Sequence, residues 1–430
     1  MEIFHYSHGH RLAPSLSKIC MYAITTNTAI LAFAKPSTKT RLSVRICSQW
    51  DELEQLVPDW NSLLQANHAA SIFQTPEWLS TWWRAFASNR RLRAVVFLDE
   101  SKNTVGILPL YTETRRFLAL DCKTLRMVGA GSGDSDALDF ITAPGFEQHC
   151  AQAFFDWLAK DKTWDVCSLE LLRQQSQAAA CLSGIAQASG WRVVSAKTPN
   201  FIVDLPKTWD EYLSMLQSGF RPLLTRYPKR LASRYRVEIV RCQDAGELDA
   251  QLQTLFALHQ MRWTGLGESG AFASAERRIF YGLMARALLD RGWLEFWRLV
   301  LNGETVAAQF CFRYHQNVYL LQEGFDPKYA AEKIGYALRA HVLQEMIRTG
   351  ATCYDFLGGA DSYKQKFGAR QASYIDLHMA GPSWRGRAFL ALRDQKTRTK
   401  LWLKDKLPAR LLARLQQQKN LPANSKLSQE

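Results

Sequence analysis

One short pattern occurs twice in this chain, and this internal repeat constrains the fold more than any other feature. Residues 95–110 read as a strand, a polar turn at 99–103 and a second strand, and residues 296–311 repeat the pattern at an offset of 201. Each copy is followed by more strand-like sequence, a helix and a short strand, at 164–171 and at 352–357. Two similar α/β units in tandem are the simplest explanation, and chance similarity between two ordinary hairpins is the alternative.

The second unit has the clearer pattern. Residues 307–314 and 318–322 predict strands, and the polar residues 315–317 between them have the length of a hairpin turn. A helix is expected from Ile334, since its apolar residues recur every four positions and Gly350 is placed to end it.

A helix is also predicted in the first unit, after Thr75 and Pro76. Threonine can accept a main-chain N–H at a helix cap, and proline suits the first helical position. One face of this helix is aromatic and apolar, and such a stripe is more typical of core packing than of ligand binding; it consists of Trp78, Leu79, Trp82, Trp83 and Phe86.

The length and composition support several folded parts. The chain has 430 residues, of which 47% are hydrophobic and 22% charged, a balance typical of a protein with a large core. We expect a loose extension over residues 1–40, a first unit over 41–200, a second over 201–380 and a basic amphipathic tail over 381–430. The overall class is α/β or α+β.

The net charge of +14 favours a negatively charged partner. Eleven basic residues lie between residues 383 and 419 against two acidic ones, interleaved with apolar residues. This composition suits a helix on an anionic membrane, and a solvated helix packed on the body is the alternative. A second basic segment, residues 221–236, contains no acidic residue.

The cysteines and the apolar stretch near the start of the chain indicate the cellular compartment of the protein. Nine scattered cysteines without a Cys-x-x-Cys pair argue against a zinc site or a disulfide framework and favour the cytoplasm. Polar residues interrupt the apolar stretch 19–34, so it is too broken to span a membrane. It resembles a signal peptide only faintly, and a loose extension is the plainer reading.

A glycine and an alanine open the helix expected in the second unit. Gly335 and Ala337 lie in its first turn, where small residues let a phosphate approach the main-chain N–H groups. The same pattern often reflects tight packing only.

Five short motifs of this chain resemble one family of enzymes. The motifs are FQTPEWLSTWW at 73–83, ALHQMRW at 257–263, AAQ at 307–309, EGFDP at 323–327 and YDFLGGADSYKQKFG at 354–368. In this order they resemble the GNAT-superfamily acyltransferases often labelled cellulose-biosynthesis acetyltransferases, which are related to Fem-type transferases. The resemblance covers roughly residues 42–375 and implies two tandem GNAT-like units.

The resemblance implies a donor as well as a fold. Acetyl-coenzyme A or another acyl-coenzyme A would bind the second unit, with its diphosphate at the helix start formed by Lys333, Gly335, Tyr336 and Ala337. One position departs from the family pattern, because Glu332 stands where the superfamily has Arg or Gln. A carboxylate repels a diphosphate, so Glu332 must turn away, with Lys328 or Lys333 compensating, or the site binds another ligand.

Three residues are candidates for catalysis. Acyl transfer needs a base for the acceptor's proton and a donor for the oxyanion. Glu323, at the end of a strand beside the expected thioester, is the first candidate for the base, and Asp355 on the next strand is the second. Tyr363 matches the family's Tyr-Lys pair and could return a proton to the leaving thiolate. The alternatives are that Glu323 and Asp355 are ordinary strand-end carboxylates and that Tyr363 lies on an exposed helix turn.

Four further residues are candidates for substrate binding. His259, Arg262 and Trp263 lie together on an expected helix, although a histidine in such a place is more often a satisfied core residue. Lys364, the second member of the Tyr-Lys pair, could hold a phosphate or a carboxylate.

The sequence therefore predicts a metal-independent cytoplasmic acyltransferase that modifies an amine or hydroxyl of a sugar or of a glycan- or lipid-linked envelope precursor. A Fem-type transferase using charged tRNA is the nearest alternative, with segment 221–236 holding phosphates. A non-catalytic partner of a polysaccharide synthase is a third reading. A general nucleic-acid-binding protein ranks low, since no zinc finger, RNA-binding aromatic signature or basic zipper is present.

Overall fold

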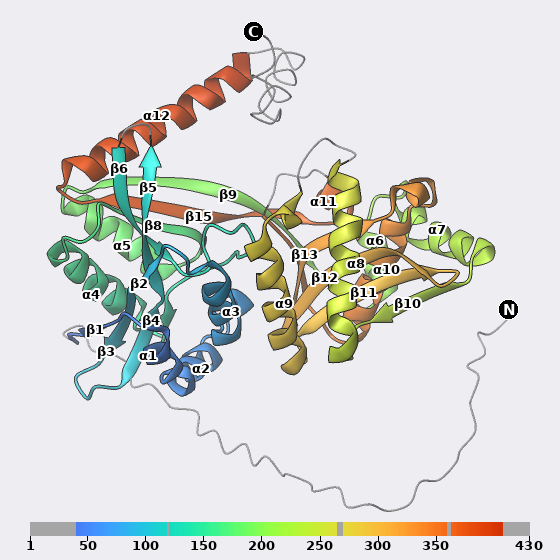
Figure 1. The fold of residues 1–430 in the computed structure, drawn as a ribbon, viewed down its shortest axis with the longest axis horizontal. Coiled ribbons are helices and arrows are strands. Elements are labelled where there is room, and N and C mark those ends of the chain that lie inside the picture. Colours follow the sequence, from blue (N-terminus) through green and yellow to red (C-terminus); the bar gives the residue numbers. More distant parts are fainter. Residues whose placement is uncertain (1–39, 118–119, 265–269, 359–362, 407–430) are drawn as a thin grey trace, which may run out of the picture. The chain divides into compact units, whose positions relative to one another are not determined.

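The computed structural model describes residues 40–117, 120–264, 270–358 and 363–406 (Figure 1). The expectations for the extension, and for the tail beyond residue 406, lie outside these ranges. The strands form a four-stranded sheet of order β1-β3-β4-β7 and an eleven-stranded sheet of order β10-β11-β12-β13-β14-β9-β15-β8-β6-β5-β2. Among the described residues, no helix is both long and apolar enough to cross a membrane.

The first half of the chain contributes helices α1 to α5 and strands β1 to β9. Its elements are β1 Ser43–Cys47, α1 Trp50–Glu54, α2 Val57–Ala66, α3 Pro76–Phe86, β2 Arg91–Leu92, β3 Ala94–Leu98, β4 Thr104–Leu108, β5 Leu110–Phe117, β6 Leu120–Met127, β7 Ile141–Thr142, α4 Glu147–Lys160, β8 Val166–Arg173, α5 Gln177–Ala188 and β9 Arg192–Asp204.

The second half follows the same alternation of strands and helices. Its elements are α6 Trp209–Met215, α7 Arg221–Arg234, β10 Val237–Arg241, α8 Ala245–Thr264, α9 Ala275–Asp290, β11 Leu294–Leu301, β12 Glu304–Tyr314, β13 Asn317–Phe325, α10 Ile334–Arg348, β14 Cys353–Gly358, α11 Tyr363–Lys366, β15 Arg370–Ala380 and α12 Trp384–Lys406.

The repeat in the sequence corresponds to a repeated arrangement of strands and helices in the structure. The two predicted hairpins are β3-β4 and β11-β12, each antiparallel. Each half also contains one parallel pair, β6 with β8 and β13 with β14, and each pair is connected through a helix, α4 or α10. Both β8 and β14 contain a leucine with positive φ, Leu171 and Leu357, each at 59°. Two similar α/β units in tandem therefore account for the fold, as the repeat predicts.

The two units exchange their last strands at the centre of the large sheet. β9 ends the first unit and lies between β14 and β15, while β15 ends the second unit and lies between β9 and β8. β9 and β15 pair with each other over eleven residue pairs, from Arg370 with Ile202 to Ala380 with Arg192. One continuous sheet therefore joins the two units.

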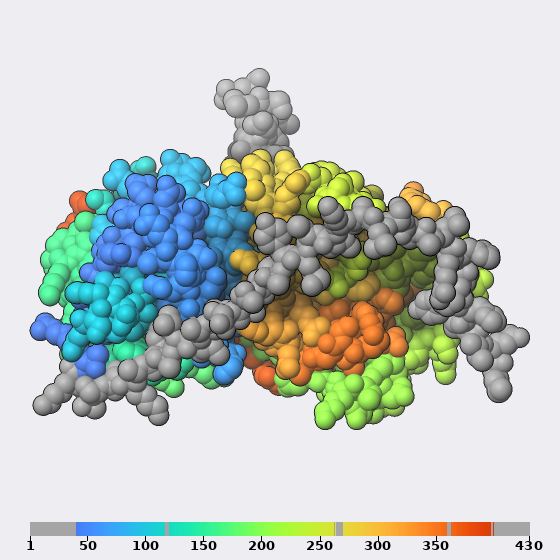
Figure 2. Space-filling view, turned by 90° about the horizontal axis from the view of Figure 1, so that it is seen from below, coloured from blue at the N-terminus to red at the C-terminus, as the bar shows by residue number. Residues whose placement is uncertain are grey.

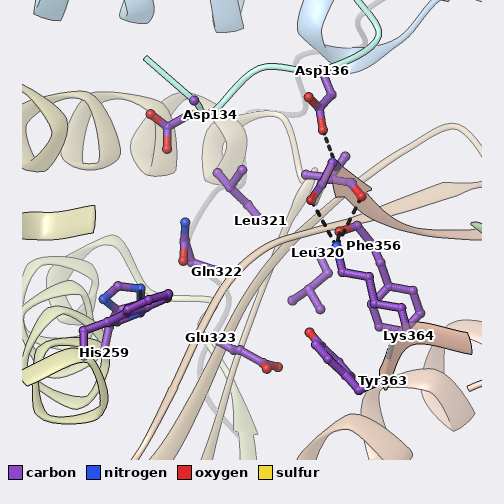
Figure 3. A pocket seen from close by; sticks show the side chains of 14 residues that line it. Asp134, Asp136, His259, Leu320, Leu321, Gln322, Glu323, Phe356, Tyr363 and Lys364 are labelled. Carbon is purple, nitrogen blue, oxygen red and sulfur yellow. Dashed lines mark hydrogen bonds between the residues drawn. The ribbon is translucent and has the colours of Figure 1, made fainter. Parts of the chain in front are cut away.

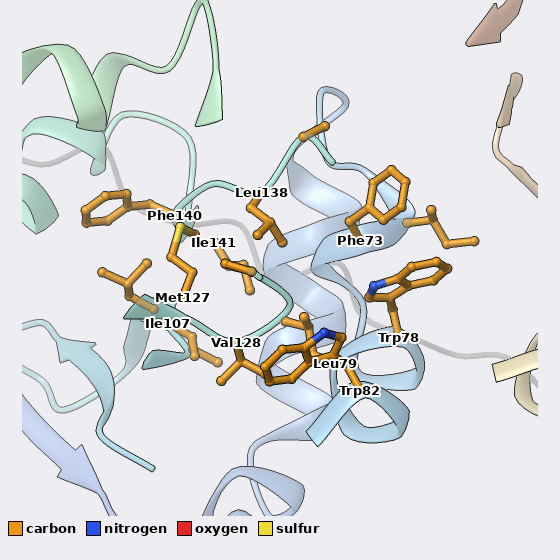
Figure 4. Close-up of a cluster of buried hydrophobic side chains, with 14 of the residues drawn as sticks. Phe73, Trp78, Leu79, Trp82, Ile107, Met127, Val128, Leu138, Phe140 and Ile141 are labelled. Carbon is orange, nitrogen blue, oxygen red and sulfur yellow. The ribbon is translucent and has the colours of Figure 1, made fainter. Parts of the chain in front are cut away.

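Helix α3 forms as its sequence predicts and lies in the core (Figure 4). The Thr75 side chain accepts the N–H of Trp78, and Pro76 is the first helical residue. Trp78 and Trp82 are fully buried. Trp78 also packs edge-on against Phe280 of α9 with 5.5 Å between ring centroids, and the two segments adjoin in the space-filling view as blue against yellow (Figure 2). The aromatic face is therefore core, and it joins the two units.

Helix α12 begins as a packed helix on the body. Phe389 and Leu390 are buried against Cys122, Val166 and Ala380. The helix approaches the sheet so closely that a Cβ on Gly386 would lie 2.0 Å from the carbonyl oxygen of Asp165. The start of the basic tail therefore agrees with the alternative of a helix packed on the body of the protein.

Candidate active site

A pocket opens in the second unit where two parallel strands separate. β13 and β14 pair over only three residues, from Asn317 with Cys353 to Tyr319 with Asp355. Beyond this point the strands diverge, and residues 320–323 and 356–358 line a pocket of about 270 Å³. The main-chain groups of the diverging strands no longer pair with each other, so their hydrogen-bond partners must come from side chains or from a ligand that enters between the strands. Figure 3 shows the side chains around this pocket.

Glu323 faces the pocket and is held by Arg339, a residue that the motifs did not single out. The guanidinium of Arg339 donates to Glu323 Oε2. Arg339 is 4% exposed and lies over the rings of Phe356, Tyr363 and Phe367, 4.7–5.5 Å from their centroids. A buried arginine needs such a partner, since an unpaired buried charge is costly. One signal was available: Arg339 lies four residues after Gly335, on the same face of α10.

His259 and Trp263 are brought to the pocket by α8 and contact each other. The indole N–H of Trp263 donates to His259 Nε2 at 2.8 Å, so a neutral His259 carries its proton on Nδ1. His259 is only 3% exposed, yet it lines the pocket together with Trp263. Arg262 belongs to α8, and its side chain lies outside the described part of the structure.

Tyr363 and Lys364 also line the pocket, but their surroundings differ from an exposed helix turn. Lys364 is 4% exposed, and its ammonium donates to the carbonyl oxygens of Phe356, Leu357 and Gly358 at 3.0–3.4 Å. These carbonyls belong to the end of β14 that has separated from β13. Lys364 therefore stabilises the open strand end.

Asp355 lies behind the pocket wall and is not among its lining residues. It is 5% exposed, accepts the N–H of Leu357 at 2.7 Å and accepts the Tyr374 hydroxyl at 3.2 Å. Burial raises the pKa of this carboxyl to about 7, opposed by the Leu357 N–H. Its contacts are those of a residue that fixes the bulge in β14.

The first turn of α10 presents the predicted donor-binding residues. Lys333 precedes the helix with φ of 56°, and Ala337 is buried. A Cβ on Gly335 would meet only Phe325, at an ordinary 3.8 Å, so the space over this residue is open. Tyr336 stacks on Phe367 with 5.8 Å between centroids.

Glu332 is neutralised by the basic helix α7. Arg234 donates to Glu332 Oε1 at 2.7 Å. The carboxylate that departs from the family pattern is thus engaged by a guanidinium, and its repulsion of a diphosphate at α10 is reduced. Arg234 therefore supplies a compensating charge, a role that the sequence suggested for Lys328 or Lys333.

The first unit contributes three residues to the pocket, and none was predicted. They are Gly133, Asp134 and Asp136. Two tryptophans of α3 hold this segment, because Trp78 Nε1 donates to Ser135 Oγ at 2.9 Å and Trp82 Nε1 donates to Ser132 Oγ at 3.0 Å. The aromatic helix therefore has a second effect, since it fixes a wall of the pocket.

Comparison with known proteins identifies the fold. Residues 218–365 match the family model of the acetyltransferase (GNAT) domain. No curated protein matches the chain by sequence. The crystal structure of FemX shares 11% identity over 75% of this chain and 95% of FemX, with a TM-score of 0.52. A conserved protein of unknown function from Bacteroides thetaiotaomicron shares 12% identity over 79% of this chain and 100% of its own, with a TM-score of 0.50.

The chain therefore has a GNAT acyltransferase fold of two units, with the matched domain in the second. The matched region contains the diverging strands, α10 and five of the pocket's predicted residues: His259, Trp263, Glu323, Tyr363 and Lys364. The narrower assignment to cellulose-biosynthesis acetyltransferases stays a prediction from the motifs.

Proposed function

We propose that this protein is a cytoplasmic acyltransferase that uses acyl-coenzyme A at the gap between β13 and β14. The observation that carries the proposal is the short parallel pairing of these strands, which ends at Tyr319 and Asp355 and opens into the pocket. The chain after β13 passes through the short helical segment Pro327–Glu332 into α10, whose first-turn N–H groups can bind the diphosphate. A thioester that follows the gap would reach Glu323 and Tyr363.

In this proposal the pocket residues carry the proton transfers. Glu323 takes the proton of the acceptor, whose nitrogen or oxygen forms a bond to the thioester carbonyl carbon. The carbon–sulfur bond then breaks, and Tyr363 gives a proton to the leaving thiolate. Arg339 keeps both residues in place, since it is bonded to Glu323 and lies 5.3 Å from the Tyr363 ring centroid. Main-chain N–H groups of the diverging strands are candidates for oxyanion stabilisation.

The acceptor of this proposal is a sugar or a related glycan- or lipid-linked envelope precursor. This assignment rests on the motif resemblance. The basic residues of the tail would bring the enzyme to an anionic membrane surface where such precursors are found.

A second candidate function is transfer from charged tRNA, and α7 favours it. Five exposed basic residues lie on this helix, including the partner of Glu332; they are Arg221, Arg226, Lys229, Arg230 and Arg234. A basic face beside the donor site could hold a 3′-phosphate of coenzyme A or the backbone of an RNA.

Ligand binding tests the donor. We expect acetyl-coenzyme A or a longer acyl-coenzyme A to raise the melting temperature, because a ligand that binds only the folded state stabilises it. Gly335→Val should fold normally, since the space above Gly335 is open, but should block the diphosphate and weaken binding in calorimetry. Gly282→Val is the matched control, because Gly282 lies in helix α9 and a Cβ there would have no heavy atom within 4 Å. Stabilisation by charged tRNA alone would favour the second candidate.

A further inference from the structure

Each unit is joined to the other through a carboxylate that accepts a main-chain N–H. In the first unit, the N–H of Leu171 in β8 donates to Asp376 of β15 at 2.8 Å. In the second unit, the N–H of Gly358 in β14 donates to Asp136 of the first unit at 2.7 Å. Both bonds lie at a leucine of positive φ, which is Leu171 itself in β8 and Leu357, the residue before Gly358, in β14. The two bonds are therefore reciprocal.

The gap beside this irregular strand end is filled in the first unit and open in the second. β6 and β8 pair over three residues, as β13 and β14 do. Leu138 then forms a parallel bridge with Leu172 of β8, and the other side of Leu172 pairs with Ile375 of β15. Leu138 thus lies on the side that β6 has left, among buried side chains (Figure 4). The first unit separates its strands by inserting chain between them, whereas the second unit has a pocket of about 270 Å³ there.

Side chains bond to the main chain of β14 where this strand has separated from β13. Asp355 accepts the N–H of Leu357, and Asp136 accepts the N–H of Gly358. The ammonium of Lys364 donates to three successive carbonyl oxygens of the same segment. A buried main-chain group without a partner is costly, so separated strands would otherwise tend to pair again. These side chains therefore favour the open gap.

Asp136 acts on β14 from the side of the pocket. Gly358 pairs with Asn200 of β9 on one side, while Asp136 is among the residues that line the pocket. Figure 3 shows the bond to Gly358 as the dashed line that leads from Asp136. The Gly358 N–H is therefore occupied on the side from which β13 has separated, by a residue that belongs to neither strand.

The position of Asp136 is fixed by two helices, one from each unit. Ser135 accepts the indole N–H of Trp78 in α3 at 2.9 Å. Asp134 accepts the guanidinium of Arg277 in α9 at 2.9 Å. Because its two neighbours are bonded to packed helices, Asp136 has a rigid support and does not simply follow the movements of β14.

We propose that Asp136 is a positioning residue, through which the first unit holds β14 away from β13 and keeps the gap of the second unit open. The inference rests on the proposed function, because this gap is the place where the thioester would lie. It gives the first unit a part in donor binding, although the gap of the first unit is itself filled. In this role Asp136 acts through an oxygen that accepts a hydrogen bond, and its charge is not required.

The role predicts how the affinity for the donor responds to substitution. When the oxygen at position 136 is removed, the Gly358 N–H loses this partner and the two strands pair again in a fraction of the molecules. Only the open fraction binds the donor, so the apparent Kd rises in inverse proportion to that fraction. An amide oxygen accepts an N–H as a carboxylate oxygen does, so asparagine should keep the gap open.

Three variants of Asp136 and one matched control test the inference. Asp136→Ala removes the acceptor without adding bulk, Asp136→Leu removes it at similar size, and Asp136→Asn keeps an oxygen but removes the charge. Asp376→Ala is the control, because it removes the corresponding partner of the Leu171 N–H beside the filled gap. Asp376 also accepts the Thr198 hydroxyl, so the control loses two hydrogen bonds rather than one.

Two measurements follow the gap. Calorimetry gives the Kd for acetyl-coenzyme A. Hydrogen exchange followed by mass spectrometry reports on the gap without any donor, because main-chain N–H groups of residues 320–323 that face the gap gain partners when the strands pair again.

We expect Asp136→Ala and Asp136→Leu to raise this Kd by about 5- to 50-fold, the effect of one lost hydrogen bond at a buried group, and to slow exchange in residues 320–323. Asp136→Asn and Asp376→Ala should match the wild type in both measurements. An unchanged Kd in the folded alanine variant would overturn the inference. So would equal impairment of Asp136→Asn, which would show that the charge matters, or an equal rise in Asp376→Ala, which would show general loosening of the fold.

The proposed function can fail separately. If the wild-type protein binds neither acetyl-coenzyme A nor a longer acyl-coenzyme A, the proposed donor is wrong. Hydrogen exchange in the same variants would still test the hold of Asp136 on β14, since this measurement needs no donor. Equal exchange of residues 320–323 in the wild type and in both Asp136→Ala and Asp136→Leu would then overturn the inference as well.

Discussion

Gly324 of β13 lies directly against His259 of α8. A Cβ at position 324 would be 2.6 Å from the main-chain nitrogen of His259 and 2.9 Å from the carbonyl carbon of Leu258. Two of the sequence motifs, EGFDP and ALHQMRW, therefore meet at this contact. The absence of a side chain at Gly324 is what lets α8 bring His259 and Trp263 to the same pocket as Glu323.

Gly324→Ala should push α8 away from β13. Overpacking of this kind costs about 1–3 kcal/mol, so we expect a lower free energy of unfolding in urea and weaker thiol release. Gly282→Ala in α9 meets no neighbour and should be neutral or slightly stabilising, because alanine favours a helix. Wild-type stability in Gly324→Ala would show that the helix shifts without cost.

Removal of the Arg234 charge should weaken donor binding. Arg234→Ala leaves the Glu332 carboxylate uncompensated beside the start of α10, so calorimetry should give a several-fold higher Kd for coenzyme A. Adding Glu332→Gln to this variant should restore most of the affinity, since the repelling charge is then gone. Equal affinities in all three proteins would place the diphosphate elsewhere.

Replacement of the proposed base should affect chemistry more than binding. Glu323→Gln keeps the shape and an oxygen for Arg339 but removes the proton acceptor, so kcat should fall by about 10² to 10⁴. Calorimetry should give an unchanged Kd for acyl-coenzyme A. Glu304→Gln, at the exposed start of β12, is the control. Wild-type turnover in Glu323→Gln would move the role to Asp136 or to water.

Asp355 should make stability depend on pH. Its folded pKa of about 7 lies above the usual value near 3.9, so the folded state binds more protons between these two values. The contribution of Asp355 is therefore most favourable below about pH 4 and is lost as pH rises through 7. Asp355→Asn lacks this dependence. In urea unfolding, the free energy of unfolding of the variant should therefore increase relative to that of the wild type from pH 5 to pH 8. A difference that does not change with pH would contradict this.

The distal part of the tail can be tested without disturbing the docked start of α12. Lys404, Lys406, Arg410 and Arg414 follow the buried Phe389 and Leu390, and each basic residue near an anionic surface contributes about 1 kcal/mol. Replacing these four residues with glutamine should reduce sedimentation with anionic vesicles at low salt. High salt should abolish wild-type binding as well. A wild-type protein that stays in the supernatant at both salt concentrations would exclude a membrane role.

Local features of the fold could be predicted because their causes are local in sequence. The cap at Thr75, the hairpin turn at 315–317 and the helix from Ile334 follow from side-chain chemistry and spacing within a few residues. The exchange of β9 and β15 could not be predicted, because the pairing of each strand depends on residues far away in the sequence, which the assembled sheet brings together.

The difference between local and long-range causes also explains which residues of the site could be predicted. Glu323, His259 and Tyr363 lie in recognisable motifs, so the sequence could nominate them. Asp136 lies 222 residues from its partner Gly358, in a segment without any motif, and its place depends on indole N–H groups of α3. Contacts at such separation leave no periodic signal in a single sequence.

Because the two units exchange strands, the first unit can complete its part of the sheet only after the second unit has been synthesised. Leu172 of β8 obtains its neighbour Ile375 only after about two hundred further residues have been synthesised. Until then β8 offers an unpaired edge to other chains, a recognised route to aggregation. We expect that neither half folds as an autonomous enzyme, and gene fragments divided between β9 and α6, at residues 205–208, should yield soluble protein only when both are expressed together.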